Sequence, residues 1–367
     1  MMKLIISVLT LLLFYQSVYS AQSVTTETLA TGLGVPWGMT IMPDNTLLIT
    51  QREGQLSQLD LKTGSLTHIT GLPAIKVSGQ GGLLDVALSP DYANNQWIYF
   101  SYSKDISGQA ATTLARAKLI DQRLVEWQDI LITRSTTDTS YHFGGRITFD
   151  NNKHIFISVG ERGFRPNAQD LSTHAGAILR LNLDGTVPTD NPFVGNKNAL
   201  PEIWSYGHRN PQGLFFNKVT GQLWEIEHGP RGGDEINLIE AGKNYGWPII
   251  SYGKEYYTPF AVGEATEKAG MEQPVKVYIP SIAPSALIQY MGNAFPDWHS
   301  NLLAGALKLQ HLNRIVLDQH NRAISETRLL RNIEGRIRNI IESPEGYLYV
   351  STDDGRILKI SPAADSE

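Results

Sequence analysis

Short apolar stretches alternate with tight turns along almost the whole chain. In each recurring unit an apolar stretch leads into a turn with Pro, Asp, Asn or Gly, then a second stretch of aromatic and β-branched residues, and then a polar segment with Gly. Runs of this kind, bounded by turn residues, are typical of β-strands. Six copies can be traced, which include Trp37–Thr50, Gly82–Tyr102, Gly145–Val159, Gly213–Ile226, a weaker pair of stretches at Leu302–Leu307 and Arg314–Leu317, and Ile337–Ile360.

The spacing of these copies predicts a closed ring. Units that recur every roughly 45–80 residues suit the blades of a propeller, whose radial arrangement protects the strand edges. Val24–Leu29 is β-prone and could pair in the same blade as Gly355–Ile360, which would close the ring. We therefore expect an all-β, six-bladed β-propeller with four-stranded antiparallel blades over residues 21–367. An open array or two β-sandwiches are the alternatives.

Composition narrows the class of protein. Hydrophobic residues make up 41% of the chain and charged residues 18%, which is typical of a globular protein with a substantial core. The net charge of −5 and the lack of a basic run argue against nucleic-acid binding. The chain has no cysteine, so its stability must come from the core and from any bound metal rather than from disulfides.

The N-terminus has the pattern of a secretory signal. Lys3 precedes an apolar run at Leu4–Phe14, and the small residues Ser17, Ser20 and Ala21 follow. The pattern predicts a signal peptide at residues 1–20 and export to the periplasm. An uncleaved membrane anchor is the alternative, but the run is short for a bilayer span, so we expect no stable membrane insertion after cleavage.

Three long, polar, turn-rich segments stand out between the predicted strands. They are Arg162–Thr173, Asp184–Asn198 and Gly253–Gln273. In a toroid the loops of one face converge on the central axis, so residues far apart in the sequence can build one site. We expect all three segments to be functional loops on the top face.

Two motifs carry chemistry suited to a ligand and a cation. Tyr206–Leu214 places a His, an Arg and an Asn in a stiff turn before a strand, which fits ligand binding or local capping of the backbone. In Glu227–Asn237, the adjacent Asp234 and Glu235 offer the hard oxygen ligands that calcium prefers. A solvated acidic turn is the alternative, and the spacing is not that of an EF-hand.

Further candidates are a histidine and a late group of basic residues. His142 opens a predicted strand and could act as a general base or have a structural role. Arg336 and Arg338 lie two apart, so on a strand they share a face, and with Lys308 they could hold a polyanionic ligand or form a solubilising surface.

Several enzyme classes lack their signatures. The Gly-rich turn Gly79–Leu84 has neither the Lys nor the Ser/Thr of a phosphate loop. The chain has no Gly-x-Ser-x-Gly nucleophile elbow and no cysteine, which argues against a serine hydrolase, a thiol enzyme and a zinc-thiolate site.

Taken together, four motifs resemble the soluble quinoprotein glucose dehydrogenase family, and more closely its aldose sugar dehydrogenase branch. They are Gly79–Asp85, Gly207–Gly213, His228–Asn237 and Asn244–Pro248, and the resemblance covers nearly the whole mature chain in order. It implies noncovalent pyrroloquinoline quinone (PQQ) on top of a six-bladed propeller, calcium, oxidation of aldose sugars to lactones, and transfer of the electrons to an external acceptor.

The resemblance also implies roles for individual residues. The positions that match cofactor contacts are Gln80, Arg209, Asn210, Lys308, Arg336 and Arg338. One calcium would bind the carbonyls of Gly229 and Pro230 and the cofactor, and a second would bind Asp234, Glu235 and the Tyr245 carbonyl. His142 matches the general base that takes the proton of the anomeric hydroxyl, and Arg209 would act on the quinone oxygens.

The sequence departs from the glucose enzymes near the base. Glu161-Arg162-Gly163 replaces their acid-glutamine-glycine stretch, and Tyr141 stands where they have an acidic residue, so their glucose contacts are not implied. Loops shorter than theirs suggest a more open site. A calcium-dependent propeller lactonase would have no use for the Lys308, Arg336 and Arg338 set, and a non-catalytic propeller that binds carbohydrate or protein is the third reading.

Overall fold

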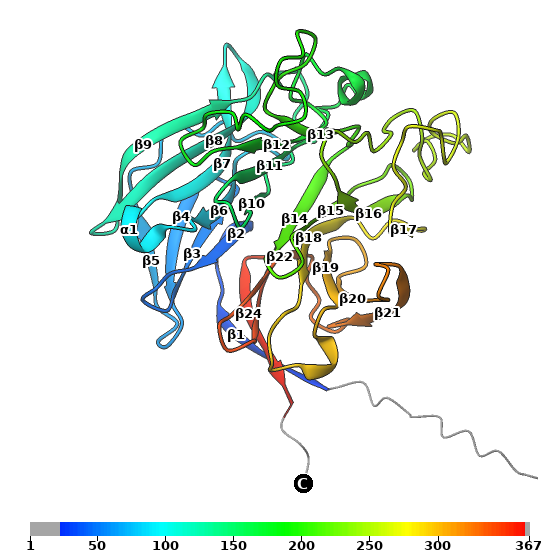
Figure 1. Ribbon diagram of the computed structural model, residues 1–367. Coiled ribbons are helices and arrows are strands. Elements are labelled where there is room, and N and C mark those ends of the chain that lie inside the picture. Colours follow the sequence, from blue (N-terminus) through cyan, green and yellow to red (C-terminus); the bar gives the residue numbers. More distant parts are fainter. Residues whose placement is uncertain (1–22, 364–367) are drawn as a thin grey trace, which may run out of the picture.

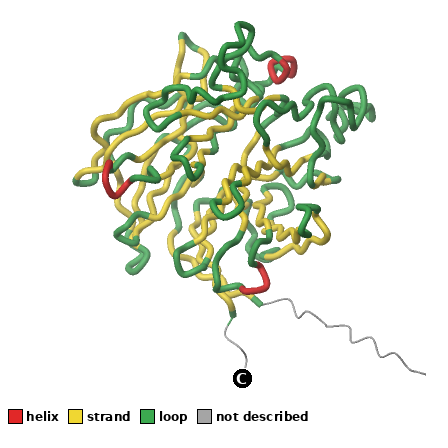
Figure 2. Tube along the Cα trace, viewed as in Figure 1, coloured by secondary structure: helices red, strands yellow, loops and turns green. Residues whose placement is uncertain are grey.

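Six four-stranded antiparallel sheets follow one another along the chain and are arranged around a central axis. The computed structural model describes residues 23–363, so the predicted signal peptide at residues 1–20 lies outside the described residues. Strands and connecting loops make up nearly all of the described chain (Figures 1 and 2). The predicted all-β, six-bladed propeller is therefore confirmed.

Each blade is a meander that runs from an inner strand at the axis to an outer strand at the rim. The first two blades are β2 (Pro36–Ile41), β3 (Thr46–Gln51), β4 (Gln55–Asp60) and β5 (Leu66–Ile69), then β6 (Leu83–Leu88), β7 (Ile98–Ile106), β8 (Gln109–Ile120) and β9 (Arg123–Ile132). The third and fourth are β10 (Ile147–Phe149), β11 (Ile155–Val159), β12 (Ala177–Leu181) and β13 (Ile203–Tyr206), then β14 (Pro211–Asn217), β15 (Gln222–Glu227), β16 (Asp234–Ile239) and β17 (Lys276–Tyr278).

The fifth blade is β18 (Pro284–Gln289), β19 (Leu302–Ala306), β20 (His311–Leu317) and β21 (Ala323–Leu329), and the sixth is β22 (Ile337–Glu342), β23 (Leu348–Thr352), β24 (Arg356–Pro362) and β1 (Val24–Ala30). The helical pieces among the described residues are short: α1 (Tyr92–Asn95), and the 3-10 turns Arg165–Gln169 and Pro296–Trp298.

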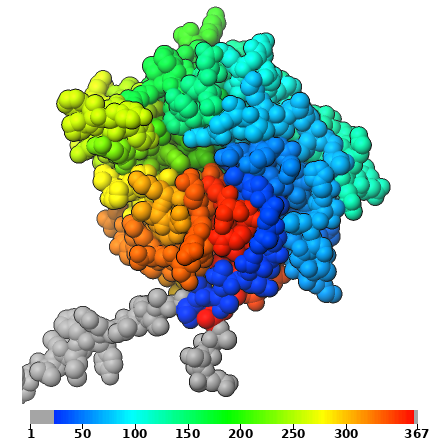
Figure 3. Space-filling model, turned by 180° about the vertical axis from the view of Figure 1, so that it is seen from behind, coloured from blue at the N-terminus to red at the C-terminus, as the bar shows by residue number. Residues whose placement is uncertain are grey.

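The ring closes through the two ends of the chain. β1 pairs antiparallel with β24, with Val24 opposite Pro362 and Thr28 opposite Leu358. The first and last strands are side by side on the surface in Figure 3, where blue meets red. The predicted closure is therefore confirmed, and the N-terminal strand completes the sixth blade.

The predicted position of the fifth repeat was wrong by one strand. The stretches predicted for the fifth copy are β19 and β20, whereas the inner strand of that blade is β18, Pro284–Gln289. Its sequence begins Pro-Ser-Ala, and an aromatic-rich connection that includes Tyr290, Phe295 and Trp298 separates it from β19. The weak apolar signal of β18 and the length of this connection explain why the pattern missed it.

Neighbouring blades pack face to face, so central strands are buried on both faces. Along β3, Leu47 and Ile49 pack with residues of the sixth blade, whereas Leu48 packs with residues of the second. Successive side chains of a strand point to opposite faces, which explains why this strand is a continuous apolar run rather than an alternating one. Each interface between blades is thus a separate hydrophobic layer.

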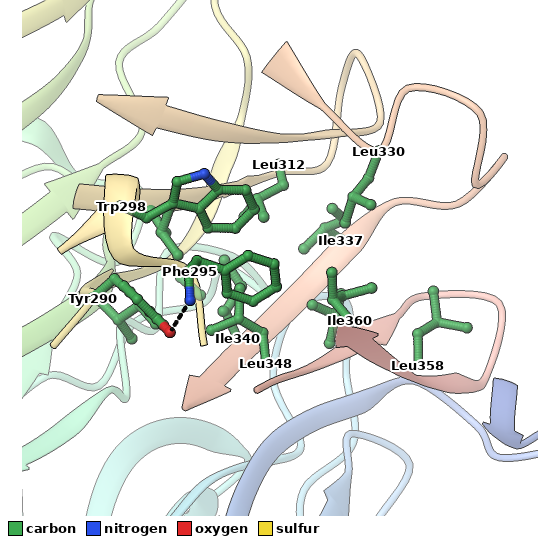
Figure 4. Close-up of a cluster of buried hydrophobic side chains, with 14 of the residues drawn as sticks. Tyr290, Phe295, Trp298, Leu312, Leu330, Ile337, Ile340, Leu348, Leu358 and Ile360 are labelled. Atoms are coloured by element: carbon green, nitrogen blue, oxygen red, sulfur yellow. Dashed lines mark hydrogen bonds between the residues drawn. The ribbon is translucent and has the colours of Figure 1, made fainter. Parts of the chain in front are cut away.

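The layer between the fifth and sixth blades is rich in aromatic rings (Figure 4). Phe295 and Trp298 stack with ring centroids 4.1 Å apart. The backbone N–H of Phe295 donates to the hydroxyl of Tyr290 at 3.0 Å, so the one polar atom of that ring is satisfied inside the core. These residues attach the connection between β18 and β19 to the sixth blade.

A buried arginine ties the inner strands together at the axis. Arg146 donates to Asp85 Oδ1 on β6 at 2.9 Å, to the Gln212 carbonyl on β14 at 3.0 Å and to the Ser285 carbonyl on β18 at 3.1 Å. Its guanidinium also lies 4.3 Å from the ring centre of Trp37 on β2. One side chain from the third blade therefore contacts four other blades.

Among residues 23–363, no helix has both the length and the apolar character needed to cross a bilayer.

Candidate functional site

The candidate site lies at the end of the axis where the loops before the inner strands converge with the loops between the second and third strands of the blades. A cavity of about 150 Å³ opens there. Its lining comes from all six blades and consists of Trp37, Arg52, Gln80, Phe143, Gly144, Asn210, Gln212, His228, Leu307, Arg336, Arg338 and Asp353. Of the predicted cofactor contacts, the structure brings Gln80, Asn210, Arg336 and Arg338 together around this cavity.

The cavity carries an excess of positive charge. Among its lining residues there are three guanidiniums and a single carboxylate, Asp353. Asp353 pairs with Arg338 at 2.7 Å and with Arg336 at 2.9 Å. Burial lowers the pKa of His228 to about 3, so this lining residue is neutral and adds no charge. The donor set therefore suits a planar ligand that carries several negative charges.

His142 is held against a carboxylate at the edge of the site. Its Nδ1 contacts Glu161 Oε1, and its backbone N–H donates to Gln80 Oε1 at 2.8 Å. Burial lowers the pKa of His142, and the positive charge of Arg209 lowers it further, although Glu161 opposes both effects. The ring is therefore neutral at neutral pH and able to accept a proton.

Glu161 was not singled out as a site residue from the sequence. It is 1% exposed, and its Oε2 has no hydrogen-bond partner in the described part of the chain. An acidic residue two positions after the apolar strand β11, at the end where the loops converge, is the signal that could have indicated it. It gives His142 a fixed ring orientation and a negative charge beside the proton-accepting ring.

Arg209 and Asn210 are placed by a second buried glutamate. Glu227 Oε2 accepts the backbone N–H of Arg209 at 2.5 Å and that of Asn210 at 3.2 Å. The Arg209 guanidinium donates to the His228 carbonyl at 3.0 Å, and it lies 5.2 Å from the ring centre of Trp247. The predicted turn at 206–214 is thus a rigid support for two candidate contacts.

Glu227 also belongs to an acidic cluster. Ligand atoms of His208, Glu225 and Glu227 lie within 4.8 Å of one another, and Glu235 is directly opposite Glu227 across the β15–β16 ladder. Burial and the charge of Glu227 raise the pKa values of Glu225 and Glu235 well above the ordinary range. A cation would relieve this repulsion, so the cluster is a candidate metal centre.

Asp234 has a different environment from its neighbour Glu235. Its Oδ1 accepts the Gly229 N–H at 2.9 Å, and its Oδ2 accepts Ser281 Oγ and the Ile282 and Ala283 N–H groups at 2.7–3.0 Å. Consecutive residues of a strand point to opposite faces, so Asp234 and Glu235 do not face the same space. Asp234 organises the turn that carries Gly229 and Pro230.

Other predicted residues are spread over the loops. Lys308 is exposed and is not in the cavity lining, although its neighbour Leu307 is. Tyr245 is buried and stacks on His208 with ring centres 4.7 Å apart, which brings it to the acidic cluster.

The three long loops do not all reach the site. The 162–173 loop follows Glu161, and in the 253–273 loop the Tyr256 hydroxyl accepts from Arg209 at 3.4 Å. The 184–198 segment was wrongly expected on the same face: its Asp190 pairs with Arg180, which also contacts His154 just before β11. His154 precedes β11 and Glu161 follows it, so this segment lies at the opposite end of the strand from Glu161.

A six-bladed propeller with a basic axial cavity, a His–Glu pair and a buried acidic cluster defines a class of ligand-binding propellers whose axial site carries groups suited to catalysis. Over residues 33–359 the sequence matches the family described as Glucose / Sorbosone dehydrogenase. The chain belongs to this family. The match includes every candidate residue above.

Individual relatives agree with the family match. The chain is 41% identical to Aldose sugar dehydrogenase YliI of Escherichia coli (strain K12), over 93% of each chain. It is 29% identical to Quinoprotein glucose dehydrogenase B of Acinetobacter calcoaceticus, over 86% of this chain and 82% of the relative.

Solved structures show the same architecture. The soluble aldose sugar dehydrogenase (Asd) from Escherichia coli in the apo-form matches with a TM-score of 0.89 and 39% identity over 93% of this chain and all of that one. The PQQ-bound form of aldose sugar dehydrogenase from Streptomyces coelicolor matches with a TM-score of 0.77 and 28% identity over 93% and 98%.

Proposed function

We propose that the protein is a PQQ-dependent aldose sugar dehydrogenase that oxidises the anomeric carbon of aldoses to lactones and passes the electrons to an external acceptor. The observation that carries this proposal is the neutral, carboxylate-paired His142 beside a cavity with excess positive charge. The similarity to aldose sugar dehydrogenases and to a quinoprotein glucose dehydrogenase supports it. A lactonase has no need of the basic cavity.

The cavity residues fit the proposed cofactor. PQQ is a flat quinone with three carboxylates, and the lining offers two flat rings, Trp37 and Phe143, with guanidiniums of Arg52, Arg336 and Arg338. The amides of Gln80 and Asn210 would contact its polar edge. Lys308 would have to turn inward from the rim to add a further charge. When bound, PQQ would supply the carbonyl carbon that accepts the hydride.

His142 would act as the general base on the anomeric hydroxyl. Its Nδ1 is engaged by Glu161, which leaves Nε2 to take the proton. Glu161 would stabilise the imidazolium that forms, as a carboxylate does in other base–orienter pairs. Arg209 would polarise an oxygen bound beside it, since its Nε has no partner in the described part of the chain.

Calcium would have two places in this arrangement. The carbonyls of Gly229 and Pro230 accept no hydrogen bond from the described chain, so they are free to face a cation beside the cofactor. A second calcium would be held by Glu235 with Glu225, Glu227 and the Tyr245 carbonyl. We do not assign Asp234 to that second ion, because protein donors engage both of its carboxylate oxygens. A calcium ion bound to Glu227 would also hold in place the carboxylate that accepts the backbone N–H groups of Arg209 and Asn210.

We also propose that the protein is exported to the periplasm with cleavage near Ser20. Mass spectrometry of the secreted or periplasmic fraction would identify the new N-terminus.

The activity is tested by dye reduction with several aldoses, before and after addition of PQQ and calcium. We expect activity only with both additions and a loss of about 10²–10⁴-fold in kcat for His142→Ala, which is the usual contribution of a general base. His154→Ala is the matched control, because His154 pairs with Asp150 at 2.8 Å at the far end of the same blade. Absence of activity under all conditions, with no quinone spectrum retained after gel filtration, would refute the proposal.

A further inference from the structure

Arg162 has no role in the proposed chemistry, and yet it is one of the largest fully buried side chains of the protein. Its side chain is 0% exposed and lies 3.5 Å from the ring centre of Phe143. Among residues 23–363 its hydrogen-bond acceptors are carbonyls and no carboxylate. Burial lowers its pKa to about 10, so it remains a cation at neutral pH. A buried cation without a hydrogen-bonded anion is costly and persists where the surroundings require it.

The guanidinium donates hydrogen bonds to the backbone of the loop that carries His142. Nη1 donates to the Tyr141 carbonyl, and Nη2 donates to the carbonyls of Thr139 at 3.1 Å and Ala110 at 3.3 Å. In return, the hydroxyls of Thr137 and Thr139 donate to the Arg162 carbonyl at 2.9 and 2.7 Å. The segment before His142 and the residue after Glu161 are therefore joined in both directions.

His142 and Arg162, which lie in the two segments joined by these hydrogen bonds, both have strained backbones. His142 has φ +58° and Arg162 has φ +62°, the left-handed region that residues with a Cβ seldom adopt. The segments that contain His142 and Arg162 approach each other closely, since a Cβ at Gly160 would collide with the carbonyl of His142. Such conformations persist only where surrounding contacts hold them in place.

We propose that Arg162 is the positioning residue of the base: it fastens the 139–143 backbone so that His142 keeps the left-handed turn in which its ring meets Glu161. This inference rests on the proposed function, in which His142 is the base. Arg162 does not line the cavity, so it would act through His142 rather than on the sugar or the cofactor.

Its charge has a second effect on the same ring. The charged and titratable groups that face His142 are Glu161, Arg209, Arg162, His228 and Tyr141, whose ring packs edge-on against the imidazole with centroids 4.8 Å apart. Burial and the two arginines lower the pKa of His142, and Glu161 raises it. Removing the Arg162 cation should therefore raise the pKa of His142, so that the acidic limb of the kcat/KM profile moves to higher pH.

Two variants separate geometry from charge. Arg162→Gln removes both the charge and the fork, whereas Arg162→Lys keeps the charge but replaces the planar fork, in which Nη1 and Nη2 reach different carbonyls, with a single nitrogen. We expect kcat to fall about 10–100-fold in both variants, because small misplacements of a catalytic group have effects of this size. The KM for the sugar and the Kd for PQQ, measured by fluorescence quenching, should change by less than about 3-fold. Only Arg162→Gln should shift the acidic limb upward.

The control is Arg180→Gln, which removes another buried arginine, 4% exposed, that lies 4.7 Å from the ring centre of Trp204, away from the site. It should lower the melting temperature and leave kcat and the pH profile unchanged. The proposal is overturned if Arg162→Gln keeps kcat within about 2-fold of wild type. It is also overturned if Arg162→Gln and Arg162→Lys lose activity only in proportion to their loss of stability.

A measurement on the protein without cofactor tests the same contact independently of turnover. NMR titration of the His142 ring should give a higher pKa in Arg162→Gln and a wild-type pKa in Arg162→Lys. The ring chemical shifts should change in both variants, because the contact of Nδ1 with Glu161 is disturbed. If Arg162→Gln does not fold, Arg162→Lys must still show the loss of kcat. If wild type is inactive with PQQ and calcium, the proposed function fails. An unchanged His142 pKa in Arg162→Gln would overturn the effect of the Arg162 charge, and unchanged chemical shifts of the His142 ring in both variants would overturn the positioning role.

Discussion

Replacing Asp85 with Asn should destabilise the propeller more than most surface changes, because it leaves a buried cation without its anion. Asp85 Oδ1 accepts from Arg146 at 2.9 Å and Oδ2 accepts the Ile147 N–H at 2.9 Å, with side chains only 5% and 7% exposed for Asp85 and Arg146. The asparagine has nearly the same shape, but it removes the charge and presents an N–H group to one of these donors.

Breaking a buried ion pair by removing one partner costs about 3–5 kcal/mol. With an unfolding entropy of about 2.1 cal/mol/K per residue, the folded residues 23–363 give about 0.7 kcal/mol/K, so the melting temperature should fall by about 4–7 °C. Differential scanning calorimetry measures this shift directly, and urea unfolding measures the free energy.

Two further variants make the test specific. Glu264→Gln breaks an exposed pair, in which Lys268 Nζ lies 2.7 Å from Glu264 Oε2 and the side chains are 46% and 69% exposed, so it should cost less than about 0.5 kcal/mol. The double variant Asp85→Asn, Arg146→Met removes both charges and should be less destabilised than the sum of the single changes. A shift of the melting temperature of less than about 1 °C in Asp85→Asn would refute the axial role of this pair. The same conclusion follows if the free-energy losses of Asp85→Asn and Arg146→Met add up to that of the double variant.

Trp298→Ala should lower the free energy of unfolding by about 3–5 kcal/mol in urea titrations, because a fully buried ring stacked on Phe295 leaves a cavity between two blades; a loss below about 1 kcal/mol would contradict this packing. A chain that begins at residue 31 lacks β1 and should melt at a lower temperature and be cleaved faster by proteases than one that begins at residue 23, since the ring is then open. Burial acts to raise the pKa of Asp353, but its pairs with Arg338 and Arg336 lower the pKa below the ordinary range, so its stabilisation is present above that range and is lost as pH falls through the lowered value. The excess stability of wild type over Asp353→Asn should therefore be full above about pH 5 and shrink below about pH 4, and equal stabilities at pH 6 would disprove it.

The blade repeat and its closure could be derived from local pattern alone. Strand runs bounded by turn residues are short-range signals, so β2, β3, β22 and β23 were found within a few residues of their bounds. The inner strand β18 was missed because its apolar run is only Ala286–Ile288 and a long connection separates it from β19.

The candidate site was only partly visible in the sequence. His142, Arg209 and Asn210 could be named because each lies in a turn with unusual polar content, and the family resemblance gave them roles. The partners that position them could not be named: Glu161 is 19 residues from His142, and Glu227 is 18 from Arg209. Sequence spacing contains no information on such pairs until the ring places the loops of different strands side by side.

The class of fold, the number of blades and the chemistry of the candidate residues follow from the amino-acid sequence, because strand period, turn residues and side-chain type are local properties. Which charged groups meet depends on how the blades are arranged in space. Adjacent Asp234 and Glu235 point to opposite faces of β16, whereas Asp85 and Arg146, 61 residues apart, form one buried pair at the axis. The physical reason is that a strand separates its neighbours onto two faces, while a closed ring of strands brings distant residues to a common centre.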